Sequence, residues 1–328
     1  MILEKEQEYR SHKNYNYSAL SALATSPGLY KYKRDNKQTG QALDNGTAVD
    51  ILVQPGGLEL FNEVFIVPTV SRPSGQLGDY IDHYFRLGDE ETAYELAGFK
   101  RDGLAKVTER FVNEGREYYN FLKDSADKVV LPLEEYQKIE RAVNTLKSNK
   151  YTSKFFSNDD ENIEIQYQVP VYFNFSGFDY KILIDIVYIN HYDKSISIYD
   201  LKTTSKGVYS FQKSFMDYRY YLQNSLYSEG LKALKINLGL EGYIGMPLKF
   251  IVQEIDGYNQ PVVYDYKRWH DFGRDGGIYK GERYKGFVEL SQELKWHTEN
   301  DLWEYPMDIY LNEGERIVEY ERGTTEVQ

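Results

Sequence analysis

Two apolar segments with charged interruptions carry most of the information about the fold: ILIDIVYI at 182–189 and SISIYDLKTT at 195–204. Successive side chains of a strand point to opposite faces, so Asp200 and Lys202 share one face. A symmetric hairpin through the intervening polar loop places Asp185 directly opposite Asp200, within side-chain reach. The sequence therefore predicts two carboxylates and a lysine in one patch of an otherwise apolar sheet.

The strand pattern extends to both sides of this hairpin. Period-2 alternation predicts strands at 164–175, 178–189 and 195–203, which form an antiparallel meander. A helix is expected at 214–234 and a further strand at 248–255. These elements predict an α/β or α+β fold with a mixed central sheet flanked by helices.

The rest of the chain is expected to be mostly helical. The further predicted elements are a helix at 17–24, a helix from Gly28, a helix at 46–53 capped by Asp44 and Asn45, a strand at 61–67, helices through 80–156 and a helix at 287–302. Residues 1–265 are expected to form one domain with N-terminal helices and a helical insertion around 80–156. Residues 266–328 are expected to extend that domain.

Composition narrows the class of protein. The chain has 328 residues, no cysteine and a net charge of −12, which excludes disulfides and thiolate sites and argues against a general nucleic-acid binder. The runs 31–37 and 266–285 are basic, and an acidic exterior with a basic channel is compatible with an enzyme that processes DNA. Neither a signal peptide nor a membrane span is apparent, so a soluble, cytoplasmic protein is expected.

The predicted charged patch points to metal-assisted hydrolysis. Asp185 and Asp200 offer hard oxygen ligands that suit Mg²⁺ or Mn²⁺. Beside them, the ammonium of Lys202 can orient a water and stabilise developing phosphate charge. The alternative is that all three residues lie on an exposed sheet face. Asp185 interrupts an apolar run, where a charge is costly without a function, and this favours the metal site.

The predicted helix at 214–234 carries a second polar group of residues. Gln223 and Tyr227 are four residues apart and share one helical face, and Arg219 extends that face by one turn. These side chains could contact a backbone phosphate or support the metal site. The alternative is an ordinary polar helix face.

Two further carboxylates are weaker candidates. Asp50 lies among apolar residues of the predicted helix at 46–53, where it could be a metal ligand or lie on the exposed face. Glu164 opens the first meander strand. The five histidines show no metal-binding spacing, and no phosphate-binding Gly-rich loop precedes a lysine. The Gly-rich stretch 273–283 could touch DNA, but a surface hairpin is favoured.

Together these motifs resemble the PD-(D/E)xK nuclease superfamily, and within it the RecB-like and RecE-like exonucleases. The second acidic position of the superfamily matches Asp185, and its (D/E)-x-K matches the tripeptide from Asp200 to Lys202. Its Q-x-x-x-Y motif matches residues 223–227. The N-terminal stretch 17–30 and the triplet Gly46-Thr47-Ala48 are similar to the RecE-like branch found in phages and prophages.

The chain departs from the family pattern at two positions. Asp50 stands where relatives usually carry histidine, and Ile184 stands where the family name has proline. The resemblance covers roughly residues 15–255 and leaves 256–328 outside it.

The resemblance implies a restriction-endonuclease-like core and an Mg²⁺-dependent exonuclease, with Mn²⁺ as a possible substitute. The metal would be held by Asp185, Asp200 and the Leu201 carbonyl, with Asp50 as an additional ligand. Lys202 would position the attacking water, and Gln223 and Tyr227 would support the site or contact DNA.

The implied substrate is double-stranded DNA with a free end. A ring-shaped homo-oligomer and a single-strand annealing protein would be partners in phage-type recombination. The alternatives are a structure-specific endonuclease of the same fold and a non-catalytic DNA-binding or assembly protein.

Overall fold

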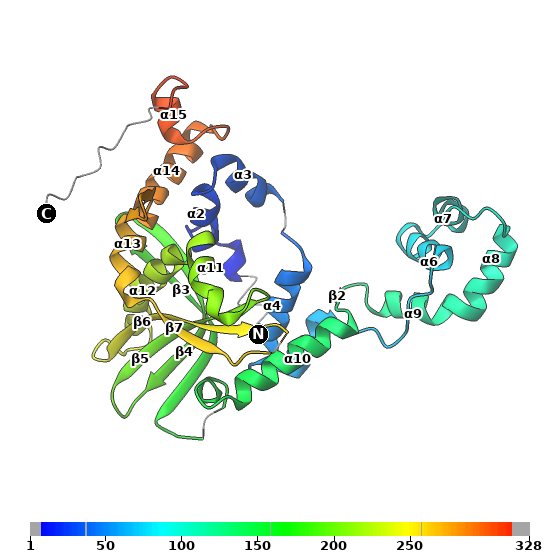
Figure 1. Cartoon of the computed structure of the whole chain (residues 1–328), viewed down its shortest axis with the longest axis horizontal. Coiled ribbons are helices and arrows are strands. Elements are labelled where there is room, and N and C mark those ends of the chain that lie inside the picture. Colours follow the sequence, from blue (N-terminus) through cyan, green and yellow to red (C-terminus); the bar gives the residue numbers. More distant parts are fainter. Residues whose placement is uncertain (1–7, 37, 158, 257, 317–328) are drawn as a thin grey trace, which may run out of the picture. The chain divides into compact units, whose positions relative to one another are not determined.

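The predicted strand meander is present and forms part of a five-stranded sheet (Figure 1). The computed structural model describes residues 8–36, 38–157, 159–256 and 258–316. The strands, in their spatial order, are β3 (Ile163–Phe175), β4 (Phe178–Asn190), β5 (Ser195–Thr204), β6 (Ile244–Glu254) and β7 (Val262–Asp265). Only the β5–β6 pair is parallel among these neighbours, so the sheet is mixed as expected.

The chain divides into two compact units. The sheet unit comprises 1–39, 149–254 and 259–328, and the helical unit comprises 40–148 and 255–258. The helical unit is inserted in the sequence of the sheet unit and includes most of the stretch around 80–156. Residues 259–328 belong to the sheet unit.

Helix α12 (Tyr220–Asn237) is the central helix of the sheet unit. Its side chains from Tyr221 to Leu231 are all buried, and it contacts β3, β4 and β6. A helix that is buried on every side belongs to the core. The other helices of this unit are α2 (Tyr17–Leu23), α3 (Pro27–Asp35), α11 (Phe211–Asp217), α13 (His270–Asp275), α14 (Phe287–Asn300) and α15 (Met307–Leu311).

The prediction of a single helix at 214–234 is wrong in one respect, because the structure has two helices there, α11 and α12. Arg219 has a φ of 58°, in the left-handed region, and stands between α11 and α12. A non-glycine residue in this conformation cannot continue an α-helix. Its Nη2 donates a hydrogen bond to the carbonyl of Ala24 (3.2 Å), which anchors the break against α2.

The C-terminal part of the sheet unit contains the surface hairpin favoured from the sequence. Strands β8 (Gly277–Tyr279) and β9 (Glu282–Tyr284) pair antiparallel. They precede α14, which confirms the helix predicted at 287–302. Strand β7 was not predicted, because its four residues are too few to show a clear period.

The helical unit is built mostly of helices, as the pattern through 80–156 predicts. Its elements are α4 (Gln41–Leu52), α5 (Gly57–Val64), β1 (Phe65–Ile66), α6 (Gln76–Leu87), α7 (Glu90–Ala97), α8 (Leu104–Arg110), a π-helical turn (Phe111–Gly115), α9 (Arg116–Asp124), β2 (Val129–Val130) and α10 (Leu133–Ser148). Across the described parts of both units, no helix is long and apolar enough to cross a membrane.

Two predicted elements of the helical unit are corrected. The strand expected at 61–67 is mostly the end of α5, and only Phe65 and Ile66 are extended. Helix α4 begins earlier than expected, after Gly40, so Asn45 is no cap. Its amide instead donates to Glu135 of α10 (2.7 Å).

Candidate active site

The β4–β5 hairpin brings the two predicted aspartates together. Its register pairs Ile186 with Tyr199, which is the register predicted from the loop symmetry. Regular pairing stops there, and the side chain of Asp185 takes over the next bond by accepting from the Leu201 N–H at Oδ2 (2.8 Å). The carboxylate of Asp185 therefore lies against the backbone of the Asp200–Lys202 segment.

Asp200 is buried and held at both carboxylate oxygens. Gln223 of α12 donates from Nε2 to Oδ1 (2.5 Å), and Lys202 Nζ pairs with Oδ2 (2.5 Å). The structure thus brings together four of the residues singled out in the sequence. Together, Asp185, Asp200 and Lys202 are called the carboxylate site below.

The ionisation of Asp185 is disturbed by its surroundings. Burial and the neighbouring charge of Asp200 raise the pKa of Asp185 to about 7. Like charges at close range in a poorly solvated place disfavour simultaneous ionisation. A bound cation would offset this cost.

Lys202 is held as a cation. Burial alone would lower its pKa, but the charges of Asp200 and Asp185 and the ring of Tyr220 raise it well above the usual lysine value. The ammonium lies over the ring of Tyr220, 5.1 Å from its centroid, in a cation–π arrangement. Lys202 is therefore suited to stabilising negative charge and not to accepting a proton.

Tyr227 lies close to the same group, as the sequence predicted for the Q-x-x-x-Y face. Burial, and then the charges of Asp200 and Asp185 together with the nearby Tyr9, raise its pKa well above the ordinary tyrosine value. Its hydroxyl therefore stays protonated and can serve as a hydrogen-bond donor.

Gln168 completes the hydrogen bonding of Asp185 and was not predicted from the sequence. It is left out of the β3–β4 ladder between the pairs Tyr167–Ile186 and Val169–Ile184, and its φ is 49°. The register is the same on both sides of this gap, so Gln168 lies opposite Asp185, to which its Nε2 donates at Oδ1 (3.2 Å). Its place opposite Asp185 depends on how β3 pairs with β4, which no local sequence signal fixes.

An N-terminal residue also reaches this neighbourhood. The charge of Asp185 contributes to the raised pKa of Tyr9. Lys181 of β4 holds this segment by donating from Nζ to the carbonyls of Tyr9 (2.7 Å) and His12 (2.6 Å). Neither Tyr9 nor Lys181 was a candidate, because they are far apart in the sequence and no local pattern links them.

Two predicted site residues lie away from the carboxylate site, and a third belongs to the other unit. Glu164 pairs with His191 near the far end of the β4–β5 hairpin (3.4 Å), at the position opposite Ile189. Arg219 sits at the α11–α12 break and not on the helix face of Gln223. Asp50 lies on α4, in the helical unit, and is half-buried.

The donor set of the carboxylate site fits Mg²⁺ or Mn²⁺. Within the described part of the sheet unit, no group of three or more His, Asp or Glu side chains could hold a metal. Mg²⁺ needs only one or two carboxylates, since it retains several waters. Each carboxylate oxygen has a second lone pair beyond its present partner, and a bound cation would offset the burial and the neighbouring charge that raise the pKa of Asp185. Asp185 and Asp200 are the carboxylates that the structure brings together there.

Comparison of the sequence with protein-family models and with curated proteins finds no match. Among solved structures, the chain is similar to the crystal structure of a protein named "Putative exonuclease" from Eubacterium rectale. The two share 12% sequence identity with a TM-score of 0.44, over 97% of this chain and 96% of that chain. A functional conclusion therefore has to come from the geometry of the site itself.

Proposed function

We propose that this protein is a metal-dependent deoxyribonuclease that digests linear double-stranded DNA from its ends. The observation that carries the proposal is the carboxylate site: two aspartates share one patch and a lysine is fixed as a cation beside them. Metal-assisted phosphodiester hydrolysis can use this combination, because negative charge grows on the phosphate as the bond breaks and cations stabilise it.

Each residue has a distinct part in this reaction. Asp185, Asp200 and the Leu201 carbonyl would hold Mg²⁺, which supplies a Lewis acid and lowers the pKa of a water. Lys202 stabilises the charge that develops on the phosphate. Gln168 and Gln223 hold the two carboxylates in position through hydrogen bonds, as groups behind metal ligands commonly do.

The wider expectations belong to the same proposal. Asp50 is proposed as an additional ligand on the resemblance to RecE-like proteins, and titration of Mn²⁺ into Asp50→Ala would show weaker binding if it contributes. A ring-shaped oligomer and a single-strand annealing partner are proposed on the same ground. Light scattering and co-purification test them.

Nuclease assays with paired variants test the activity. Wild-type protein with Mg²⁺ should shorten linear duplex and leave closed circular duplex intact. Lys202→Ala should lose about 10²–10³-fold in rate, the typical cost of removing one charge-stabilising group. Lys249→Ala is the matched control, because Lys249 also pairs with an aspartate of this sheet, Asp265 (3.5 Å).

The outcomes separate the alternatives. Cutting of circular duplex would identify an endonuclease instead. Retention of linear duplex in EDTA without shortening on addition of Mg²⁺ or Mn²⁺ would identify a binding protein. If wild type and Lys202→Ala were equally inactive with both metals, the proposal that this protein is an enzyme would be refuted.

A further inference from the structure

A cavity of about 570 Å³ lies in the sheet unit beside the C-terminal half of α12. Its walls come from α12, the start of β6 and the segment between β7 and α13. Ligand sites commonly enclose about 300–1,000 Å³. Lys232 on its wall follows Gln223 by about two and a half helical turns, so the cavity and the carboxylate site lie on opposite sides of α12.

Basic side chains dominate the lining of this basic cavity. They are Lys232, Lys235, Lys267, Arg268 and His270. Over the described ranges of the chain, the side chains of Lys235, Lys267 and Arg268 form no ion pair. Unpaired cations gathered in one hollow of a chain with a net charge of −12 create a local positive potential.

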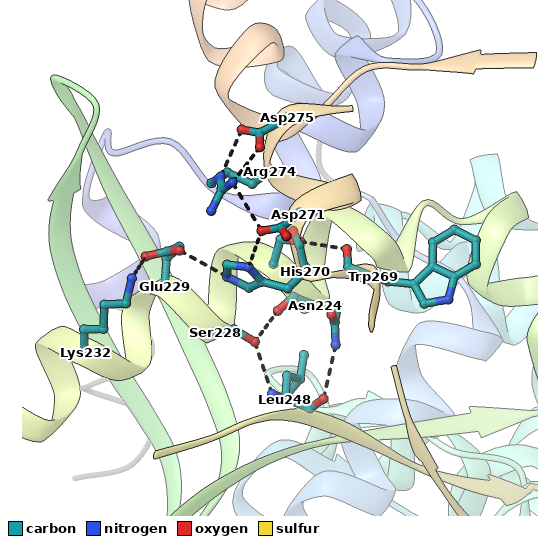
Figure 2. A network of polar contacts seen from close by, with 11 residues as sticks. Asn224, Ser228, Glu229, Lys232, Leu248, Trp269, His270, Asp271, Arg274 and Asp275 are labelled. Carbon is teal, nitrogen blue, oxygen red and sulfur yellow. Dashed lines mark hydrogen bonds and ion pairs between the residues drawn. The ribbon is translucent and has the colours of Figure 1, made fainter. Parts of the chain in front are cut away.

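The two carboxylates beside the cavity, Glu229 and Asp271, each have a cationic partner. Glu229 pairs with Lys232 (2.5 Å) and with His270 Nε2 (3.1 Å), and Asp271 pairs with Arg274 (3.2 Å) (Figure 2). Burial acts to raise the pKa of Glu229, but its contacts with His270 and Lys232 lower this pKa to about 2. The bond to Glu229 also raises the pKa of His270. The cavity therefore keeps its positive charge near neutral pH.

The frame around the cavity is rigid. Ser225 donates to the carbonyl of His270 (2.5 Å), and Asn224 donates to the carbonyl of Leu248 (3.1 Å), which ties α13 and β6 to α12. Gly273 packs so closely that an added Cβ would lie 2.0 Å from the Tyr221 carbonyl. A preorganised set of cations loses little freedom on binding.

We propose that the basic cavity binds phosphate groups of the DNA strand at a distance from the bond being cut, an inference that rests on the proposed nuclease function. Besides His270, the lining in the described chain includes no ring on which a base could stack, so the contacts are to phosphates and carry no sequence preference. From Gln223 to Lys235, α12 rises about 18 Å, a length of about five base pairs of duplex.

Binding of labelled duplex in EDTA, over a series of salt concentrations, tests the cavity without cleavage. Lys267→Ala/Arg268→Ala should weaken binding several-fold and reduce the slope of log K against log salt by about 0.9 for each phosphate that is no longer neutralised. The control Lys150→Ala/Lys295→Ala removes the same charge from elsewhere in the sheet unit and should change neither. Both pairs are exposed, so both proteins should fold.

Three outcomes would overturn the inference. The first two are that wild type does not bind DNA, or that the two variants bind it equally well. The third is that the cavity binds inorganic phosphate or dAMP in calorimetry while Lys267→Ala/Arg268→Ala leaves the affinity for DNA unchanged. Cleavage with Mg²⁺ is measured separately. If DNA binding depends on the cavity but no DNA is cleaved, the proposed nuclease function is refuted and the cavity inference stands. If DNA is cleaved but both variants bind it equally well, the cavity inference is refuted and the nuclease function stands.

Discussion

At the scale of single residues, the negative charges of the carboxylate site are only partly compensated. Lys202 is fixed as a cation between Asp200 and the ring of Tyr220, yet one positive charge is shared by two aspartates. The pKa of Asp185 is consequently raised to about 7. Catalytic sites commonly contain groups with such perturbed pKa values. The raised pKa also has a measurable effect on the free energy of unfolding.

Replacing Asp185 with asparagine should stabilise the metal-free protein while it abolishes cleavage. The folded pKa of Asp185 lies above its ordinary value of 3.8, so ionisation costs folding free energy as pH rises from about 4 to about 7. The asparagine side chain does not titrate, and we expect Asp185→Asn to be more stable than wild type by about 1–3 kcal/mol at pH 8 in EDTA. Urea unfolding at several pH values measures this difference.

Asp179→Asn, an exposed position of the same strand, is the control and should show no such pH dependence. If Asp185→Asn proved less stable than wild type at pH 8, that result would contradict the electrostatic account.

At the scale of elements, α12 links the carboxylate site to the rest of the sheet unit. Gln223 of this helix donates a hydrogen bond to Asp200. Asn224 donates to a backbone carbonyl of β6, and Ser225 donates to a backbone carbonyl at the start of α13. A buried helix with polar side chains in defined hydrogen bonds is both a core element and a positioning device.

Gln223→Leu should weaken metal-dependent activity by about 10–100-fold, the usual effect of removing a partner of a metal ligand. The loss should appear as a higher Mg²⁺ requirement, because Asp200 loses the bond that orients it. Asn224→Leu removes the neighbouring buried amide and should lower stability without shifting the Mg²⁺ requirement. An equal shift in both variants would mean that Gln223 acts only on folding.

The His270–Glu229 contact between α13 and α12 should make stability depend on pH. The hydrogen bond to Glu229 raises the folded pKa of His270, so its stabilising effect is complete below the unfolded value of about 6.5 and is lost as pH rises through the folded pKa. The unfolding free energy of wild type minus that of His270→Gln should therefore decrease between about pH 6 and about pH 9. A constant difference would rule out this contribution.

At the scale of the whole molecule, the helices from α6 to α9 have a much smaller core than the sheet unit. The sheet unit packs side chains from β3 to β7 against α2, α12 and α14 in one large cluster. A separate small cluster in the helical unit is centred on Leu77, Tyr80 and Ile81. Smaller cores give lower stability against local opening.

Amide hydrogen exchange should therefore distinguish the units. We expect the slowest exchange in β4, β5 and α12, and exchange faster by at least about tenfold in α7 and α8. Mass spectrometry of peptides from both regions measures the rates. Equal protection throughout would show that the chain opens as one cooperative unit.

The central hairpin and its chemistry could be predicted from the sequence. Alternating side chains and a symmetric loop are local properties, and they were enough to place Asp185 against the Asp200–Lys202 segment. The spacing of Gln223 and Tyr227 likewise follows from helical geometry. Glu164 shows the limit of local patterns, because its strand was predicted correctly while its distance from the site depended on pairing with Ile189.

The remaining features required the three-dimensional structure. The contact of Gln168 with Asp185, the approach of Tyr9 and the left-handed break at Arg219 each depend on partners far away in sequence. The basic cavity is of the same kind, because its lysines come from α12 and from the segment after β7. Local patterns fix the direction of a side chain along its own strand or helix, but contacts between distant segments are set by long-range packing.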